Sequence, residues 1–470
     1  MRLPFLIFLL LSLQGVSQNV VIKGKAHASH IGKQITLTDY SDYVTYTKIT
    51  ESIDTIDKNG YFQLKIQTAI TQPVNISIGN LIGKLYIQPN YVYGIYFPEA
   101  DSTFNNQEGA ESKATISIYG NDSTELNALV IDFNKQYNAF FAQATKRYLS
   151  PAKINNLLDS FFIYAHKHYK HITNSYFKTF LDYSLASLYS STSRSKAVLQ
   201  KQFIENRPIL FHNAEYMEFL NTHYKGYLND LASKKNGGSI YTSINELADY
   251  KHLWQQLSSD KNLNNDTLKE LVILKGLVDC YYNPEFEKEN VQSVIEQLYE
   301  TAVNIENKKI AFNLLQSIYQ LQVGAPAPNF IAYNKKKEPV YLTDFKKGKY
   351  VYLNFFSTQS DMSVREMQKL ADVKKKFNDK VTFISICLDD STTYQHYLKQ
   401  NPKFDWIILN HSAASNAKQL YNIKTLSGYF LINSKLEFAL SPALSPSEGI
   451  EYKFYALFRN KKKNTIPGIR

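Results

Sequence analysis

Two serines one helical turn apart, Ser360 and Ser363, are the residues whose types and spacing most invite a chemical role. They follow an apolar run, and Asp361 stands between them. A serine hydroxyl becomes a useful nucleophile beside a general base, most often a histidine. The histidines in this part of the chain, His396 and His411, are distant from the pair in sequence. We therefore favour a structural role for the serines over hydrolysis.

The structural role that this spacing supports is the start of a helix. Ser363 is followed three residues later by Glu366, which is the pattern of a capping box. In that motif the serine accepts a bond from a first-turn backbone N–H, and the glutamate accepts one from the N–H of the serine itself. The sequence predicts a helix that begins at Ser363.

The two cysteines, Cys280 and Cys387, are too few to cross-link a chain of 470 residues. Exported proteins that depend on disulfides are small and rich in cysteine. Both cysteines here stand in apolar stretches, where a buried structural thiol is the usual finding. The sequence predicts no disulfide framework.

Three histidines close together, His166, His168 and His171, raise the question of a metal site. On a helix, residues 166 and 168 point apart, whereas residues 168 and 171 share a face. No carboxylate stands at ligand spacing among them. We expect a solvated helix face flanked by lysines, and we predict neither a metal site nor a cofactor.

Residues 1–17 have the pattern of a secretory signal peptide. Arg2 supplies a positive charge, an apolar run follows, and the small residues Gly15 and Ser17 stand where signal peptidase would cleave before Gln18. The apolar run is shorter than the ~20 residues that a spanning helix needs. We predict export to the periplasm or cell envelope, with an uncleaved membrane anchor as the alternative.

The basic charge of the chain lies in its C-terminal third. The net charge is +11, and residues 321–470 contain 23 Lys and Arg against 12 Asp and Glu, so the rest is balanced. Lysine runs at 335–337, 374–376 and 461–463 could contact an acidic partner or an anionic membrane surface. Solvated lysine faces are the simpler interpretation. Export makes nucleic acid a poor candidate.

Apolar periodicity divides the mature chain into three parts, which predicts a multidomain α+β protein. Residues 18–112 contain short β-branched and aromatic runs between turn residues, which is typical of a β-sandwich. Residues 113–322 have apolar residues at three- and four-residue steps, which predicts an all-α middle domain. Residues 323–470 combine apolar strands with helices as an α/β domain does. Strands of the sandwich are predicted at 20–24, 34–38, 61–65, 74–78 and 91–97.

The 35 tyrosines of the chain are spread over all three parts. Ordinary packing accounts for such a dispersed pattern better than sugar stacking does. A glycan- or lipid-binding protein stays open as a further hypothesis, and it would require an exposed aromatic platform.

The order of motifs in the third part resembles the TlpA/ResA-like branch of the thioredoxin superfamily. Residues 324–330 match the opening G-x-x-A-P-x-F, and an apolar run at 350–356 matches the central strand. A second apolar run at 381–388 is followed by Asp389, and residues 429–433 match the strand of the F-L-I-D motif. The resemblance implies a thioredoxin-like fold for residues 323–470.

In active members of this family the central strand is followed by a C-x-x-C motif. An alignment on Phe355 and Glu366 places Ser360 and Ser363 at the two cysteines, and it places Ser427 at the cis-proline. Disulfide exchange needs a thiolate, which a serine does not supply. Without the proline we expect a trans bond before Ser427, because a cis bond costs ~3 kcal/mol at other residues.

The resemblance and the missing thiols together predict a non-enzymatic envelope protein whose thioredoxin-like domain binds a protein or peptide. An acidic partner is one option. The alternative is a thiol-disulfide oxidoreductase or thiol peroxidase of the TlpA/ResA type that uses Cys387. This cysteine stands near the carboxyl end of a predicted parallel strand. The alternative requires an accessible Cys387 with a lowered pKa.

Overall fold

The computed structural model describes residues 18–79, 81–99, 112–120, 122–145, 151–192, 194–233, 238–345, 348–411, 415–423 and 425–459. The predicted signal peptide and the third lysine run lie outside these ranges. Contacts divide the chain into two compact units, one of residues 1–78, 83–99 and 114–310, the other of residues 311–470 with 79–82 and 100–113. Within the described ranges, every helix is too short or too polar to cross a bilayer.

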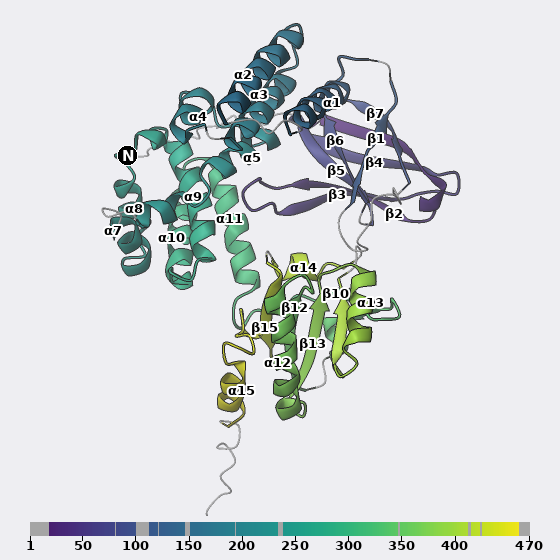
Figure 1. Ribbon diagram of the computed structural model, residues 1–470, viewed down its shortest axis with the longest axis vertical. Helices are drawn as coiled ribbons and strands as arrows, with labels where there is room; N and C mark the ends of the chain where they lie inside the picture. Colours follow the sequence, from purple (N-terminus) through teal and green to yellow (C-terminus); the bar gives the residue numbers. More distant parts are fainter. Residues whose placement is uncertain are drawn as a thin grey trace, which may run out of the picture. The chain divides into compact units, whose positions relative to one another are not determined.

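The N-terminal part is a β-sandwich of two sheets (Figure 1). One sheet has the strand order β4-β1-β7-β9 and the other has the order β3-β2-β5-β6-β8. Strand β4 alternates exposed and buried residues along its whole length, as a strand with one solvated face does. The strands are β1 (Gln18–Ala26), β2 (Gln34–Tyr40), β3 (Lys48–Thr55), β4 (Tyr61–Thr68), β5 (Gln72–Ile78), β6 (Leu81–Ile87), β7 (Val92–Phe97), β8 (Ser112–Ala114) and β9 (Ser117–Ile118).

Side chains of β3 cover the free edge of β4. Asp54 Oδ2 accepts a hydrogen bond of 2.7 Å from the backbone N–H of Gln63, and Ser52 Oγ accepts one of 3.2 Å from that of Lys65. An uncovered edge strand is a template for pairing with another chain. These two bonds close that edge and join the two sheets.

The five predicted sandwich strands are confirmed as β1, β2, β4, β5 and β7, whereas β3, β6, β8 and β9 were not predicted. The predicted end of the sandwich at residue 112 is too early. Strand β9 pairs with β7 through Ile118 opposite Ile95 and Ser117 opposite Tyr96, so the sheet continues to Ile118.

The middle part is helical, as predicted. Helix α9 buries residues on almost every side, as a helix at the centre of a helical domain does. Side chains of Asn174, Ser195, Asn213, Asp249 and Asn265 cap the N-termini of α3, α4, α5, α8 and α9. The helices are α1 (Leu126–Thr145), α2 (Pro151–His168), α3 (Ser175–Ser190), α4 (Lys196–Phe203), α5 (Ala214–His223), α6 (Tyr227–Ala232), α7 (Gly238–Tyr241), α8 (Tyr250–Gln256), α9 (Asp266–Tyr281), α10 (Lys288–Thr301) and α11 (Ile305–Gln320).

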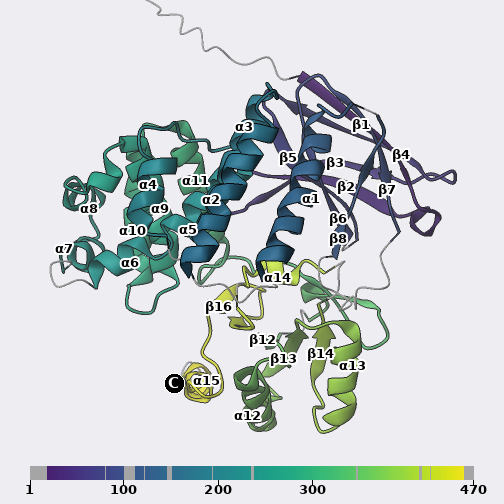
Figure 2. The same cartoon turned by 45° about the horizontal axis from the view of Figure 1, so that its top comes forward.

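The sandwich and the first helices share a core. Tyr86 of β6 is buried in one apolar cluster with residues of α1, α2 and α3. Asn127 of α1 accepts a bond of 2.7 Å from the N–H of Tyr86 and donates one of 2.8 Å to its carbonyl. Figure 2 shows α1 and α3 beside the strands. The first two predicted domains therefore form one compact unit.

The C-terminal part is a mixed α/β thioredoxin-like domain, as predicted, built on a seven-stranded sheet of order β11-β10-β14-β13-β12-β15-β16. Strands β12, β13 and β14 are parallel, and β15 is antiparallel to β12. One apolar cluster packs α12, α13 and α15 against the sheet, and a second includes α14. The elements are β10 (Ile331–Tyr333), β11 (Pro339–Tyr341), β12 (Tyr350–Phe356), α12 (Asp361–Phe377), β13 (Val381–Cys387), α13 (Ser391–Gln400), β14 (Ile407–Asn410), α14 (Ala417–Leu420), β15 (Ser427–Ile432), β16 (Phe438–Leu440) and α15 (Ile450–Arg459).

Candidate functional site

The predicted site residues meet at one end of the C-terminal sheet. Phe356, the last residue of β12, is paired with Cys387 of β13 on one side and with Ser427 of β15 on the other. A short loop from Phe356 then leads to Ser360 and into α12, where Ser363 lies in the first turn. The structure thus brings together all four residues that the sequence singled out.

Ser360 is the N-cap of α12, one turn before the predicted start. The helix begins at Asp361, and Ser360 Oγ accepts a bond of 3.3 Å from the backbone N–H of Ser363. Asp361 places a negative charge in the first turn, where the helix dipole favours it. The prediction that Ser363 caps this helix is wrong, because Ser363 already lies inside it.

Ser363 ties the start of α12 to the start of β15. Its side chain is buried, and its Oγ donates a bond of 3.1 Å to the carbonyl of Leu426. Among the described residues the cis peptide bond is Ser441–Pro442, so the bond between Leu426 and Ser427 is trans, as expected. The hydroxyl of Ser363 therefore holds the segment that leads into β15.

Glu366 also has a partner other than the predicted one. Its carboxylate accepts a bond of 2.9 Å from the backbone N–H of Ser447 and a second bond from Ser447 Oγ. The glutamate is buried and joins α12 to the loop that precedes α15. Glu366 therefore links two elements. Its bonds to Ser447 replace the predicted bond from the backbone N–H of Ser363 to its carboxylate.

Asp389 fixes the loop between β12 and α12. Its Oδ1 accepts a bond of 2.5 Å from Ser357 Oγ, and its Oδ2 accepts one of 2.6 Å from the N–H of Thr358. Asn410 donates a bond of 2.8 Å to the carbonyl of Asp389. Sequence reasoning did not single out Ser357, although its position directly after the central strand is a signal that could have identified it.

Cys387 is fully buried, with its Sγ 3.5 Å from Asp389 Oδ2. Burial, followed by the negative charge of Asp389, raises the pKa of this thiol. Cys280 is also buried and donates a bond of 3.1 Å to Asn229 Oδ1, and burial raises its pKa to about 12. Reactive cysteines have the reverse properties, namely exposure and a lowered pKa. Both cysteines therefore have the surroundings of structural thiols.

The two histidines of this domain, His396 and His411, contact other side chains. His396 Nε2 lies 2.9 Å from the side-chain amide of Gln400, and His411 Nδ1 lies 2.9 Å from Ser415 Oγ. In the part of the chain that the structure describes, the bonds of Ser360 Oγ and Ser363 Oγ run to backbone groups, the N–H of Ser363 and the carbonyl of Leu426, and not to a general base.

The histidine cluster of the helical part does not converge on one point. Helix α2 ends at His168, so His171 lies beyond it, and the expectation that these two share a helix face is wrong. His166 Nε2 lies 2.8 Å from Asp182 Oδ1, a bond that raises the pKa of the imidazole, whereas His168 Nε2 lies 3.9 Å from Asp132 Oδ2. In the part of the chain that the structure describes, no group of three or more His, Cys, Asp or Glu side chains could hold a metal ion.

The C-terminal part has a thioredoxin-like fold, and its sequence is similar to a redoxin family and to thiol-disulfide oxidoreductases. Residues 323–437 match the AhpC/TSA family. The chain is 29% identical over 97 residues to the thiol-disulfide oxidoreductase ResA of Bacillus thuringiensis subsp. konkukian (strain 97-27) and to that of Bacillus cereus (strain ATCC 10987 / NRS 248). Each match covers 19% of this chain and 56% of the relative, so the chain spans about half the length of these curated relatives.

Two of the solved structures to which parts of this chain are similar come from Bacteroides. A thioredoxin-like protein from Bacteroides caccae ATCC 43185 is 16% identical and has a TM-score of 0.36, with coverage of 50% of this chain and 92% of that one. A thiol:disulfide interchange protein from Bacteroides sp. is 19% identical and has a TM-score of 0.28, with coverage of 31% and 95%.

Proposed function

We propose that this chain is an exported envelope protein whose thioredoxin-like domain binds a protein or peptide and performs no thiol-disulfide exchange. The observation that supports this best is that both redox positions carry hydroxyls with structural partners. Ser360 Oγ caps α12, and Ser363 Oγ holds the carbonyl of Leu426. Exchange needs a thiolate at one of these positions and a second thiol to resolve the mixed disulfide.

The alternative enzyme would depend on Cys387, and its surroundings support a structural thiol. The side chain lies in the apolar cluster that packs α12 and α13 on the sheet. Burial and the charge of Asp389 both favour the neutral thiol over the thiolate. A substrate disulfide would have to enter this core to reach the sulfur.

Two exposed apolar side chains beside the contact between the segments of Ser363 and Leu426 support a binding surface there. Met362, beside Ser363 in α12, has 73% of its surface exposed, and Leu426, which supplies the bonded carbonyl, has 50%. Large apolar side chains this exposed on both segments favour contact with another chain.

The positions of the lysines in this domain indicate where an acidic partner could bind. Lys374, Lys375 and Lys376 form ion pairs within the domain, with Asp405, Asp372 and Glu451. The lysine run at 335–337 lies elsewhere, and Lys335 and Lys336 line a groove of about 750 Å³ together with Phe404 and Trp406. Lys335 and Lys336 are the cations that an acidic segment of the partner would meet there, beside the carboxylates of Glu338 and Asp344, which accept bonds from Asn334 and Tyr341.

Site-specific photo-crosslinking tests the binding surface. A benzophenone amino acid at position 362 should give a discrete crosslinked product in the native envelope, because Met362 is exposed beside the proposed contact. The matched control is position 375 on the same helix, whose lysine is also exposed. Equal products at both positions, or none at position 362, would contradict a partner at this end of the sheet.

Thiol titration in the native protein tests the absence of exchange chemistry independently. With Ellman's reagent at pH 8, neither Cys280 nor Cys387 should react until denaturant is added, because both are buried with raised pKa values. Rapid reaction of one thiol in the folded protein, lost in Cys387→Ser, would favour the enzymatic alternative.

A further inference from the structure

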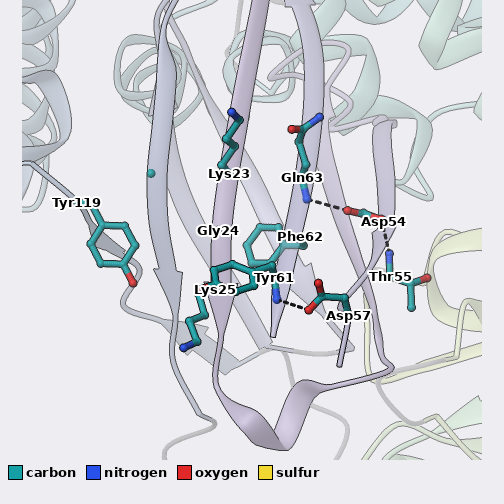
Figure 3. Close-up of a pocket in the computed structure, with 11 residues that line it drawn as sticks. Lys23, Gly24, Lys25, Asp54, Thr55, Asp57, Tyr61, Phe62, Gln63 and Tyr119 are labelled. Atoms are coloured by element: carbon teal, nitrogen blue, oxygen red, sulfur yellow. Dashed lines mark hydrogen bonds between the residues drawn. The ribbon is translucent and has the colours of Figure 1, made fainter. Parts of the chain in front are cut away.

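The outer face of the four-stranded sheet of the sandwich carries an open groove of about 820 Å³ (Figure 3). Two tyrosines line it: Tyr61 of β4, with 55% of its surface exposed, and Tyr119, which follows β9, with 60%. Figure 3 shows Tyr119 on one side of the groove and Gln63 on the other, with Lys23 and Lys25 on β1 between them. This is the exposed aromatic platform that a sugar-binding protein requires.

The floor of the groove is open because β7 has a glycine at its middle. Gly94 pairs with Lys23 of β1, and the backbone N–H of Tyr119 donates a bond of 2.7 Å to the carbonyl of Gly94. The ring of Tyr119 lies against this glycine, since a Cβ there would stand 3.3 Å from the ring. A side chain at position 94 would fill the space between the ring and the lysines.

The groove presents cations that lack carboxylate partners. Lys23 and Lys25 alternate on β1, so both project from the outer face, and both are exposed. Among the described residues neither lysine has an ion pair, and the ammonium of Lys25 lies 5.5 Å from the centre of the Tyr61 ring. Their charge is therefore available to an anion.

The carboxylates that line the same groove are bonded to the backbone. Asp57 Oδ1 accepts bonds of 2.8 Å from the N–H groups of Asn59 and Tyr61, which shape the hairpin before β4. Asp54 accepts bonds of 2.7 Å from the N–H groups of Thr55 and Gln63. These bonds fix both carboxylates toward the backbone, and among the described residues neither forms an ion pair with Lys23 or Lys25.

We propose that this groove binds an anionic polysaccharide. Sugar rings stack on the exposed faces of Tyr61 and Tyr119, whose π-faces accept the C–H groups of a pyranose ring. Carboxylate or sulfate groups of the sugar pair with Lys23 and Lys25, and the Gln63 amide is placed to bond a sugar hydroxyl. A lipid is a poorer match, because the exposed lining apart from the two rings is charged or polar. The proposal is independent of the one for the thioredoxin-like domain.

Calorimetric titration of the chain from Gln18 onward tests this with four probes: an oligogalacturonate, dextran sulfate, neutral dextran and a single-stranded oligothymidine. We expect binding of the oligogalacturonate or of dextran sulfate, and which of the two binds identifies the anionic group. Neutral dextran should bind at least about tenfold more weakly, a factor that corresponds to about 1.4 kcal/mol.

Variants at exposed positions locate the site. The double variant Lys23→Ala, Lys25→Ala and the single variant Tyr119→Ala should each weaken binding by about tenfold or more. Lys48→Ala on the other sheet and Tyr91→Ala, both at exposed positions, are matched controls that should leave it unchanged. Melting temperatures equal to that of the wild-type protein would show that each variant is folded.

The proposal would be overturned by no binding of either acidic sugar, by equal binding of neutral dextran, or by binding that the groove variants leave intact. Equal affinity for oligothymidine with the same dependence on the lysines would also overturn it, because it would show a general polyanion surface.

Discussion

Replacing Glu366 with alanine tests how α12 is held in the C-terminal domain. Sequence spacing assigns Glu366 to a capping box with Ser363, whereas the structure bonds it to Ser447. The two arrangements make opposite predictions for double-mutant cycles, because a cycle reports coupling between residues that share an interaction.

The magnitudes follow from burial and charge. Hydrogen bonds to charged groups contribute about 1.5–3 kcal/mol, and exposure of Ser447 reduces this. We expect Glu366→Ala to lower the free energy of unfolding by about 2 kcal/mol and Ser447→Ala to lower it by about 1 kcal/mol. The coupling energy of this pair should be about 1 kcal/mol, whereas Glu366→Ala and Ser363→Ala should be additive within about 0.5 kcal/mol.

Tryptophan fluorescence can follow the C-terminal unit alone. The chain has two tryptophans, Trp254 and Trp406. In a Trp254→Phe background, Trp406 reports on the domain of interest, since its Nε1 bonds Ser385 Oγ at 2.8 Å and its ring packs on Phe404. Urea unfolding of the three single and the two double variants then gives each free energy.

The reverse pattern would refute this reasoning. Coupling of about 1 kcal/mol between Glu366 and Ser363, with additivity between Glu366 and Ser447, would mean that the helix begins with a capping box at Ser363. Ser360→Ala separates the two arrangements again. It should cost about 1 kcal/mol as the loss of an N-cap, and almost nothing if the helix began later.

Three further predictions concern other parts of the chain. Burial raises the pKa of Asp39 from 3.8 to about 6, so between these pH values the folded state binds more protons than the unfolded state. The free energy of unfolding therefore falls, by at most about 3 kcal/mol, as pH rises through this window. Asp39→Asn should flatten this pH dependence in urea unfolding of the first unit, and an unchanged dependence would contradict the prediction. Ser360→Cys with Ser363→Cys should form a disulfide in oxidised glutathione, seen as a loss of two hydrogens by mass, and failure would show that these positions are not the redox pair. The natively expressed protein should begin at or within a residue or two of Gln18 by intact mass and fractionate outside the cytoplasm, whereas a retained Met1 in the cytoplasm would contradict export.

Periodicity predicted the elements whose burial alternates cleanly and missed those whose burial does not. Strand β4 exposes every second residue and was predicted, whereas β3 leaves most of its residues exposed. Strand β6 was also missed, since it is buried at consecutive residues where Tyr86 enters the helical core. The sharing of one core by the sandwich and the helices depends on Asn127 and Tyr86, residues distant in sequence, so local patterns could not reveal it.

At the candidate site, sequence reasoning predicted which residues meet but not how they bond. The order of strands was sufficient to bring Ser360, Ser363, Cys387 and Ser427 together. The capping prediction failed because two serines at helical spacing both fit an N-cap, and the choice depends on tertiary partners. Leu426 supplies the acceptor that draws the hydroxyl of Ser363 away from the helix end.

The central claim, that the thioredoxin-like domain has no exchange chemistry, is tested most directly by insulin reduction with dithiothreitol. The wild-type protein should give no turnover above the dithiothreitol background, and Cys387→Ser should be indistinguishable from it. Turnover by the wild-type protein that disappears in Cys387→Ser would contradict the account.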